Sequence, residues 1–240
     1  MTRTLENKIA VVTGGSGAIG SAIIAGLEEQ GACAVSLDVS RPAKSAAPFQ
    51  SCDVRDDSSV ASAIAEVLHI YGHLDLVVHG AGVSREAVLW KLAVEDWDFV
   101  HSVNLRGAFL LLRHAIPVMR AGKGGRIVLI GSINGSRGKF GTSAYSASKA
   151  GLIALAKTVA REVARLGMLI NVVEQGWVRT PLTDSLPQAV RDAALAENLV
   201  GRYVEPADVP AAVTFLCGPG AQQITGQILR VDGGQSLGSV

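Results

Sequence analysis

The sequence is poor in cysteine, and its few cysteines form no recognisable pattern. They are odd in number, lie far apart and lack metal-ligand spacing: Cys33, Cys52 and Cys217. Such cysteines predict neither a disulfide framework nor a zinc site. We therefore expect reduced thiols in a cytoplasmic protein that binds no metal.

Long apolar runs and an excess of one charge are also missing. No stretch approaches the roughly 20 apolar residues that a membrane-spanning helix needs. Residues 1–8 carry charges where a signal peptide needs an apolar run. Lys and Arg (22) are interspersed among Asp and Glu (21), and the net charge is +1. Without a basic stripe, the sequence predicts binding neither to nucleic acid nor to a membrane.

Apolar residues, in contrast, are abundant: they make up 48% of the chain, against 18% for charged residues. This composition predicts a folded protein with a large core. Short apolar runs alternate with helical stretches such as Ala18–Gln30. Runs of this kind fit strands that are buried on both faces of a parallel sheet. They are Ile9–Thr13, Ala34–Asp38, Leu74–His79, Arg126–Ser132, Leu169–Val173 and Gln227–Val231.

The alternation predicts an α/β fold, with a doubly wound parallel sheet and helices on both faces, in a single domain over residues 1–240. One connection differs from the others. Only residues 39–52 separate the second run from Asp53, and they include Pro42 and Pro48. Because two prolines in so short a stretch disfavour a full helix, we expect the crossover helix there to be reduced or missing.

A glycine-rich turn lies between the first apolar run and the first helical stretch. It reads Thr13-Gly14-Gly15-Ser16-Gly17-Ala18-Ile19-Gly20. Glycines let the backbone approach a pyrophosphate closely, and the following helix offers free N–H groups and its positive dipole end. Such a turn alone is a weak indication. Here an acidic residue, Asp38, follows 18 positions after Gly20, which is close to the spacing expected for a ribose contact.

Asp38 bears on the choice of cofactor. Its carboxylate can accept hydrogen bonds from both hydroxyls of an adenosine ribose, whereas a 2′-phosphate would meet a like charge. Arg41, three residues later, could bind that phosphate and keeps NADP as the alternative. Because no basic residue lies in the glycine turn, the sequence favours NAD.

Tyr145 and Lys149 are four residues apart in a long helical stretch. This spacing puts both side chains on one face of the helix. An ammonium about 4 Å from a phenol, at an effective dielectric near 20, favours the phenolate by about 4 kcal/mol, which is on the order of two to three pKa units. A tyrosine tuned in this way can act as an acid or base near neutral pH. The same spacing also occurs in ordinary surface pairs.

The chain resembles the short-chain dehydrogenase/reductase family along nearly its whole length. Several of the motifs are degenerate, but their order and spacing are specific. They are residues 13–20, Cys52-Asp53-Val54, His79-Gly80-Ala81-Gly82, Val103-Asn104-Leu105, Ile130-Gly131-Ser132, Tyr145 to Lys149, Gln175-Gly176-Trp177-Val178-Arg179-Thr180, Ile224-Thr225-Gly226-Gln227 and Val231-Asp232-Gly233-Gly234. The resemblance implies a Rossmann fold and hydride transfer between a nicotinamide and a small-molecule substrate.

The resemblance also assigns catalytic roles. It implies that Tyr145 is the general acid/base, and that Ser132, thirteen residues upstream, holds the substrate oxygen. Lys149 would tune Tyr145 and bind the nicotinamide ribose. Asn104 would hold, through its helix, a water that relays protons from Lys149 to solvent.

The turn and the resemblance together predict the cofactor-binding residues. Asp53 and Val54 would contact adenine, Val178 would pack beside the nicotinamide and Thr180 would contact its carboxamide. The full set is Gly14, Ser16, Gly17, Ala18, Ile19, Gly20, Asp38, Asp53, Val54, His79, Ala81, Gly82, Tyr145, Lys149, Gly176, Val178 and Thr180.

Three positions depart from the family's pattern. Ala18 replaces a glycine of the turn and adds one methyl near the phosphates. His79-Gly80 stands where the family usually has Asn-Asn, and we expect His79 to line the cofactor site rather than act as a base. Gln175 replaces a proline, which frees a backbone N–H and would loosen the nicotinamide loop.

The substrate side is predicted in less detail. Residues beside the catalytic motifs could contact substrate: Ile133, Asn134, Phe140 and Trp177, with Arg137 as a candidate for attracting an anion. The segment Pro181–Asn198 should cover the pocket. Its Leu182, Leu186 and Val190 predict an apolar lining, although ordinary packing explains them equally well.

These expectations combine into an NAD(H)-dependent oxidoreductase that interconverts a secondary alcohol, for example a 3-hydroxyacyl compound, and its ketone. The alternative is an NADPH-dependent 3-oxoacyl-thioester reductase, which Ser84-Arg85-Glu86 and Gly151-Leu152-Ile153 resemble. A more remote alternative is a non-catalytic protein that senses NAD. The resemblance further implies a homotetramer assembled through the helices that contain Asn104 and Tyr145.

Overall fold

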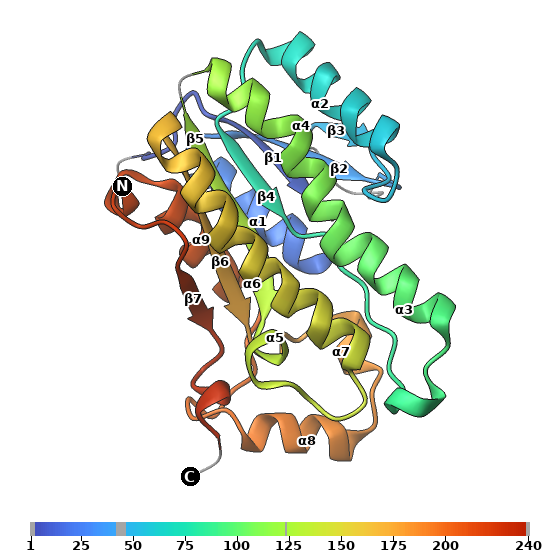
Figure 1. Ribbon diagram of the computed structural model, residues 1–240. Coiled ribbons are helices and arrows are strands. Elements are labelled where there is room, and N and C mark those ends of the chain that lie inside the picture. Colours follow the sequence, from blue (N-terminus) through green and yellow to red (C-terminus); the bar gives the residue numbers. More distant parts are fainter. Residues whose placement is uncertain (1–2, 42–46, 123, 239–240) are drawn as a thin grey trace.

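A computed structural model describes residues 3–41, 47–122 and 124–238, except for the side chain of Leu182 (Figure 1). The described strands form one parallel sheet of seven strands, in the order β3-β2-β1-β4-β5-β6-β7. They are β1 (Ile9–Thr13), β2 (Cys33–Asp38), β3 (Phe49–Ser51), β4 (Leu76–His79), β5 (Gly125–Ser132), β6 (Met168–Gln175) and β7 (Ile228–Val231). The predicted α/β fold is therefore confirmed.

Side chains of each strand point alternately to the two faces of the sheet, and each face has its own apolar core. In β1, for example, Val11 belongs to one core and Val12 to the other. The first core lies under α2 (Asp57–Tyr71), α4 (Gly107–Ala121) and α6 (Ser143–Val163). The second lies under α1 (Ala18–Glu29) and α9 (Val209–Cys217) (Figure 1). This is the expected doubly wound arrangement.

Six of the strands lie where the apolar runs predict them, and β1 matches its run at both ends. The sequence did not predict β3, a three-residue edge strand that pairs with residues Ser36 to Asp38 of β2. The described residues between β2 and β3, namely 39–41, 47 and 48, contain no helix, as expected. Pro42 belongs to residues 42–46, which lie outside the described part of the chain.

The remaining helices surround the carboxyl ends of β4, β5 and β6. They are α3 (Val94–His101), α5 (Ile133–Arg137), α7 (Pro181–Asp184) and α8 (Gln188–Ala196). Between α3 and α4 the chain forms one π-helical stretch, η2 (Ser102–Arg106). Short 3₁₀ turns are η1 (Leu89–Lys91), η3 (Ala164–Leu166), η4 (Pro206–Asp208), η5 (Pro219–Ala221) and η6 (Gln235–Leu237).

The order of the strands reverses between β1 and β4, whose last residues Thr13 and His79 lie side by side. From β1 the chain first adds β2 and β3 on one side, and then β4 to β7 on the other. Ligands of open α/β sheets bind where the order reverses, outside the carboxyl ends of the strands. The topology therefore predicts a ligand site at the loops that follow Thr13, His79 and Ser132.

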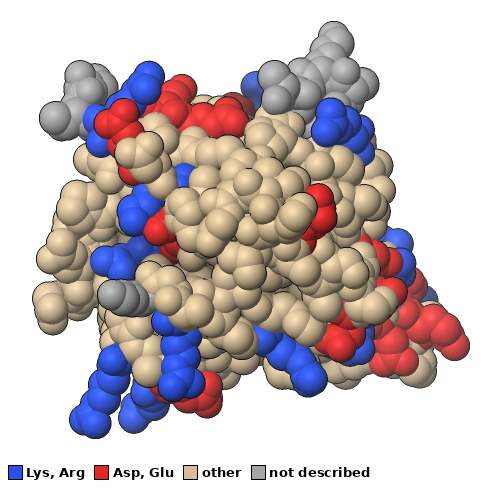
Figure 2. All heavy atoms as spheres, turned by 90° about the horizontal axis from the view of Figure 1, so that it is seen from above, with Lys and Arg blue, Asp and Glu red and all other residues tan. Residues whose placement is uncertain are grey.

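The face shown in Figure 2 carries both acidic and basic side chains, as the near-neutral net charge leads one to expect. Seen from above, acidic and basic side chains both lie around the edge of the molecule, and uncharged residues cover most of the middle (Figure 2). Among the described residues, none of the helices combines the length and the hydropathy required to span a membrane.

Candidate active site

A pocket of about 510 Å³ lies at the carboxyl ends of β4, β5 and β6. Its walls come from segments far apart in the sequence: the start of α1, the loop after β4, the end of β5 with α5, the first turns of α6, and the loop after β6. The sequence-predicted residues that line it are Ile19, Gly82, Ser132, Ile133, Asn134, Arg137, Tyr145, Lys149, Gly176, Trp177, Val178, Thr180 and Leu186. The fold thus brings the candidate catalytic and nicotinamide-side residues into one pocket.

Ser132 and Tyr145 face each other across this pocket. Ser132 ends β5 and caps α5, where its hydroxyl accepts a hydrogen bond from the Asn134 N–H at 3.2 Å. Tyr145 lies in the first turn of α6 and lines the same pocket, close enough to Ser132 for the Ser132 side chain to affect its pKa. Desolvation raises the pKa of Tyr145 above its ordinary value, the Ser132 side chain opposes this rise, and the carboxylate of Glu86 adds to it. One substrate oxygen can therefore contact both hydroxyls.

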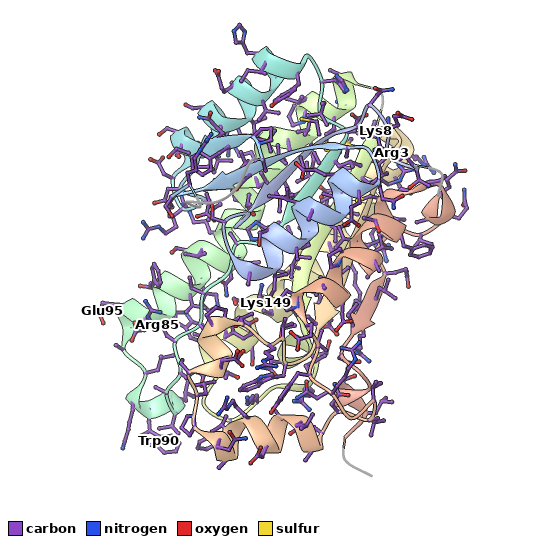
Figure 3. All side chains as sticks on the ribbon, turned by 180° about the vertical axis from the view of Figure 1, so that it is seen from behind. Arg3, Lys8, Arg85, Trp90, Glu95 and Lys149 are labelled. Atoms are coloured by element: carbon purple, nitrogen blue, oxygen red, sulfur yellow. The ribbon has the colours of Figure 1, made fainter. Side chains whose placement is uncertain are left out.

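Lys149 lies one helical turn beyond Tyr145 and is almost completely buried, with 3% of its surface exposed. Figure 3 shows it in the interior of the molecule. Its ammonium donates a hydrogen bond to the backbone carbonyl of Ile130 at 2.8 Å and lies 5.7 Å from the centre of the Tyr145 ring. Because burial disfavours the charged form, the pKa of Lys149 falls to about 8.

The expected lowering of the Tyr145 pKa is wrong for this arrangement. The spacing predicts an ammonium about 4 Å from the phenol, but the Lys149 ammonium instead lies over the ring and bonds to Ile130. Desolvation of the hydroxyl is the largest influence on the pKa of Tyr145, and it acts upward. The helix spacing fixes which face the two side chains share but not where the ammonium points.

Asn104 lies in the π-helical stretch and is completely buried. Its side chain accepts a hydrogen bond from the Val83 N–H at 2.8 Å and donates to the Val83 carbonyl at 3.0 Å. It also donates to the Ser148 hydroxyl at 2.9 Å, and Ser148 donates to the Tyr145 carbonyl at 2.7 Å. Asn104 therefore connects the loop after β4 to the helical turn that carries Tyr145 and Lys149.

The turn after β1 fits a dinucleotide pyrophosphate. Gly17 precedes α1 without a capping side-chain hydrogen bond, and the first turn of α1 contains no acidic residue, so its N–H groups can serve an anion. Gly14 has a φ of +69°, and a Cβ there would lie 2.8 Å from the backbone of Ala81. A Cβ on Gly20 would lie 2.1 Å from the Gly14 carbonyl oxygen. The turn therefore requires these glycines.

Asp38 lies at the end of β2, beside the turn. Its carboxylate accepts hydrogen bonds from the Ser16 N–H at 3.1 Å and the Val39 N–H at 2.8 Å. The guanidinium of Arg41 lies over the Phe49 ring, 5.3 Å from its centre. Farther along this edge, the carboxylate of Asp53 is paired with Arg55 at 2.7 Å. Asp38 is thus fixed beside the phosphate turn.

The structure clarifies the three departures from the family's pattern. Ala18 is exposed at the start of α1, so its methyl is accommodated. His79 is completely buried and absent from the pocket lining, so its ring lies behind the pocket rather than facing it. Gln175 is the last residue of β6 and is paired with β5 and β7. The strand therefore continues to the loop, contrary to the expected loosening.

Two of the substrate-side candidates lie outside the pocket lining. Phe140 is 85% exposed and does not line the pocket. Val190 lies on α8 outside the pocket lining and is 41% exposed, whereas Leu186 lines the pocket. The side chain of Leu182 lies outside the described part of the structure.

A polar cluster that the sequence did not predict closes one side of the pocket. Arg137 pairs with Glu197 at 2.7 Å and donates to the Gln235 carbonyl at 3.0 Å. The amide of Gln235 donates to Glu197 at 3.0 Å and accepts from the Trp177 N–H at 2.8 Å. Arg137 is therefore occupied by internal partners rather than free for an anion. The cluster fixes the end of the segment Pro181–Asn198 against the C-terminal turn η6.

The sequence analysis did not predict several other pocket residues as substrate contacts. They are Val83, Ser84, Glu86, Lys139, Thr142, Gln175 and Thr183. Among the described side chains, the Ser84 hydroxyl and the Gln175 amide oxygen are buried without a hydrogen-bond partner. Both can therefore bond a polar group of a ligand. No cluster of His, Cys, Asp or Glu among the described residues could hold a metal ion.

The glycine turn, the reversal point of the sheet and the Ser-Tyr-Lys pocket define a Rossmann-fold oxidoreductase that uses a nicotinamide dinucleotide. Comparison with known proteins identifies the family. The family profile described as enoyl-(acyl carrier protein) reductase matches residues 14–236. This chain belongs to the short-chain dehydrogenase/reductase family.

Individual relatives differ in their named substrates. The chain is 33% identical to the 3-oxoacyl-[acyl-carrier-protein] reductase of Thermotoga maritima, over 96% of this chain and 98% of that protein. It is 38% identical to the acetoacetyl-CoA reductase of a Synechocystis species, over 95% and 96%. The solved structure of the aldohexose dehydrogenase of Thermoplasma acidophilum superimposes with a TM-score of 0.92, at 29% identity over 99% of this chain and 97% of that one.

Proposed function

We propose that this protein is an NAD(H)-dependent oxidoreductase that interconverts a secondary alcohol and its ketone. The observation that carries the proposal is the joint presence of Ser132, Tyr145 and Lys149 in one pocket, next to a glycine turn that fits a pyrophosphate. A 3-hydroxyacyl compound is one substrate of this class. The same arrangement supports chemistry over mere sensing of NAD, because a binding protein would not need the three residues together.

The chemistry assigns a role to each residue. The residues around the pocket would hold a nicotinamide dinucleotide, which would supply the acceptor or donor of the hydride that the alcohol carbon loses or the ketone carbon gains. Tyr145 takes the proton of the alcohol hydroxyl in one direction and gives a proton to the ketone oxygen in the other. Ser132 holds the same oxygen by a hydrogen bond and stabilises the charge that develops there. Oxidation of one alcohol therefore releases one proton, which leaves through Tyr145.

Lys149 serves this exchange through its charge. Its pKa of about 8 leaves the ammonium mostly protonated at neutral pH. An ammonium 5.7 Å from the centre of the Tyr145 ring favours the phenolate whenever Tyr145 gives up its proton. The Ile130 carbonyl holds the ammonium at this position.

Support for NAD comes from Asp38. Two backbone N–H groups hold its carboxylate at the end of β2, where a 2′-phosphate would meet its charge. The Ser16 N–H that binds Asp38 belongs to the phosphate turn itself, so the carboxylate lies next to the expected ribose.

Replacing Asp38 with serine is expected to shift the enzyme toward NADP. The change removes a negative charge beside the 2′-position, so kcat/KM with NADP should rise about 10-fold or more, while kcat/KM with NAD falls by a similar factor. Steady-state kinetics with both cofactors test this, with Asp57→Ser on the exposed start of α2 as the matched control. A wild-type enzyme that already prefers NADP would contradict the assignment.

The second candidate is an NADPH-dependent 3-oxoacyl-thioester reductase. Two observations favour it: the names of the reductase relatives, and Arg41, whose guanidinium lies over Phe49 on the strand beside Asp38. The experiment that separates the candidates measures both cofactors with acetoacetyl-CoA and with a panel of cyclic alcohols, aromatic alcohols and aldohexoses. NAD reduction by an alcohol supports the first candidate. Turnover confined to NADPH and acetoacetyl-CoA supports the second.

A further inference from the structure

One buried titratable side chain near the site has no part in the chemistry described so far. His79 ends β4 directly behind the pocket and has no exposed surface. Its Nδ1 lies 3.0 Å from the Thr13 hydroxyl, and its Nε2 lies 3.1 Å from the backbone carbonyl oxygen of Asn104. The imidazole therefore spans the gap between the strand that leads into the phosphate turn and the π-helical stretch.

These partners determine the tautomer. A carbonyl oxygen can only accept, so the proton of the neutral imidazole must be on Nε2. Nδ1 is then the acceptor, and the Thr13 hydroxyl donates to it. That hydroxyl in turn accepts from the N–H groups of Gly80 and Ala81 at 3.2 and 3.3 Å. Donors and acceptors thus form one directed chain from the loop after β4, through Thr13 and His79, to Asn104.

The imidazole stays neutral across the working range of an enzyme. Burial and the nearby Lys149 ammonium lower the pKa of His79 to about 3, although its bond to Asn104 acts in the opposite direction. A second proton on Nδ1 would also displace the Thr13 donor. His79 therefore serves as a fixed donor and acceptor rather than as a base.

The carbonyl that His79 holds belongs to the residue that organises the proton-transfer site. A π-helical stretch interrupts the regular helical hydrogen bonds, and the Nε2–H gives the Asn104 carbonyl a donor from another element. From the same residue, the side-chain amide holds Val83 and Ser148. A Cβ on the neighbouring Gly82 would lie 3.3 Å from the Lys149 ammonium and 3.7 Å from the Asn104 amide oxygen. Asn104 and the Lys149 ammonium thus both lie beside Gly82, and Asn104 also bonds to Ser148 in the turn of α6 that carries Lys149.

We propose that His79 is a positioning residue of the proton-transfer site: its Nε2–H fixes the Asn104 carbonyl, and its Nδ1 links that carbonyl to Thr13 at the start of the phosphate turn. This inference rests on the proposed oxidoreductase function, because its effect is on proton transfer at Tyr145 and Lys149. His79 acts through Asn104 and touches neither substrate nor cofactor.

Three substitutions distinguish the role of Nε2 from the role of Nδ1. Glutamine places its amide nitrogen as many bonds from Cβ as Nε2, so His79→Gln retains a donor for Asn104. Asparagine reaches only as far as Nδ1, so His79→Asn retains a partner for Thr13 alone, and His79→Leu removes both bonds. We expect kcat within about threefold of wild type in His79→Gln, and a fall of about 10-fold or more in His79→Asn and His79→Leu.

The readouts distinguish positioning from mere stability. A purely structural role would lower the melting temperature of all three variants but leave kcat per folded active site and its pH profile unchanged. We expect instead that the pH profile of kcat shifts in His79→Asn and His79→Leu and recovers in His79→Gln, with KM changed less than kcat. His73→Leu, at a histidine bonded to the Tyr71 carbonyl outside the pocket, is the matched control. Full activity and an unchanged profile in His79→Asn would overturn the proposal.

A second measurement does not depend on turnover. Long-range ¹H–¹⁵N NMR of protein labelled with ¹⁵N-histidine reports which ring nitrogen carries the proton, and the His79 signal is the one of five that His79→Gln removes. We expect a neutral Nε2–H tautomer from pH 6 to pH 9. An Nδ1–H tautomer or a titrating imidazole would refute the positioning role. Should the wild type lack dehydrogenase activity while this tautomer is found, the proposed function fails and the His79 geometry stands.

Discussion

Replacing Tyr145 with phenylalanine is expected to lower kcat/KM by a factor of about 10² to 10⁴, the range that a positioned acid or base contributes. The change removes one hydroxyl and retains the ring that lies beside the Lys149 ammonium. Ser132 keeps its bond to the Asn134 N–H. The site should therefore stay assembled while losing the group proposed to exchange a proton with the substrate oxygen.

Binding and turnover must be measured separately in this variant. NAD affinity, followed by intrinsic fluorescence or calorimetry, should change less than about 10-fold, because at most one hydrogen bond to the cofactor is lost. Tyr71→Phe, at the end of α2 and remote from the pocket, is the matched control and should keep wild-type kinetics. Turnover by Tyr145→Phe at the wild-type rate would remove the acid/base assignment and favour an NAD-binding protein without this chemistry.

The fold could largely be predicted from the sequence because a parallel sheet buries both faces of its strands. Every residue of β1 and β4 is buried, and such runs are visible as continuous apolar stretches. The strand β3 was not predicted because it lacks such a buried apolar run. It is an edge strand of three residues, Phe49, Gln50 and Ser51, and none of them is fully buried. Its pairing with β2 depends on the neighbouring strand, which a local pattern does not reveal.

The site likewise contains residues that a sequence motif reveals and residues that no motif reveals. Ser132, Tyr145, Lys149 and the glycine turn carry sequence motifs, and the fold brings all of them to one edge of the sheet. The cluster of Arg137, Glu197 and Gln235 has no motif, because its three members come from α5, the end of α8 and η6. The motif also drew attention to His79, but only the observed bonds to Thr13 and Asn104 show that its ring lies behind the pocket.

At Lys149 the proposed function and the stability of the folded protein place opposite demands on one side chain. Burial lowers its pKa from 10.5 to about 8, so at neutral pH the folded protein holds an ammonium in surroundings that disfavour it. This shift corresponds to a loss of about 3 kcal/mol in the free energy of unfolding. A substitution that removes the ammonium would recover only part of this stability. The Ile130 carbonyl would then lack its hydrogen-bond donor, which costs about 1 kcal/mol.

Replacing Lys149 with methionine is therefore expected to stabilise the protein while largely abolishing its activity. The free energy of unfolding at pH 7 should rise by about 1–3 kcal/mol, which moves the melting temperature up by several degrees. We expect kcat/KM to fall by about 10² or more, because Tyr145 loses the positive charge beside its ring. Lys157→Met, at an exposed lysine on the same helix, is the control and should alter neither quantity appreciably.

The pH dependence tests the origin of this gain. Below pH 8 both the folded and the unfolded wild type hold the Lys149 proton, and the full loss of stability is present. Between pH 8 and 10.5 the unfolded chain binds more of this proton than the folded protein, so wild-type stability rises relative to that of the variant. The advantage of Lys149→Met, measured by denaturant unfolding, should thus be largest below pH 8 and shrink toward pH 10.5. An advantage that is independent of pH would show that methionine stabilises by packing alone, and that the lysine is not strained by its charge.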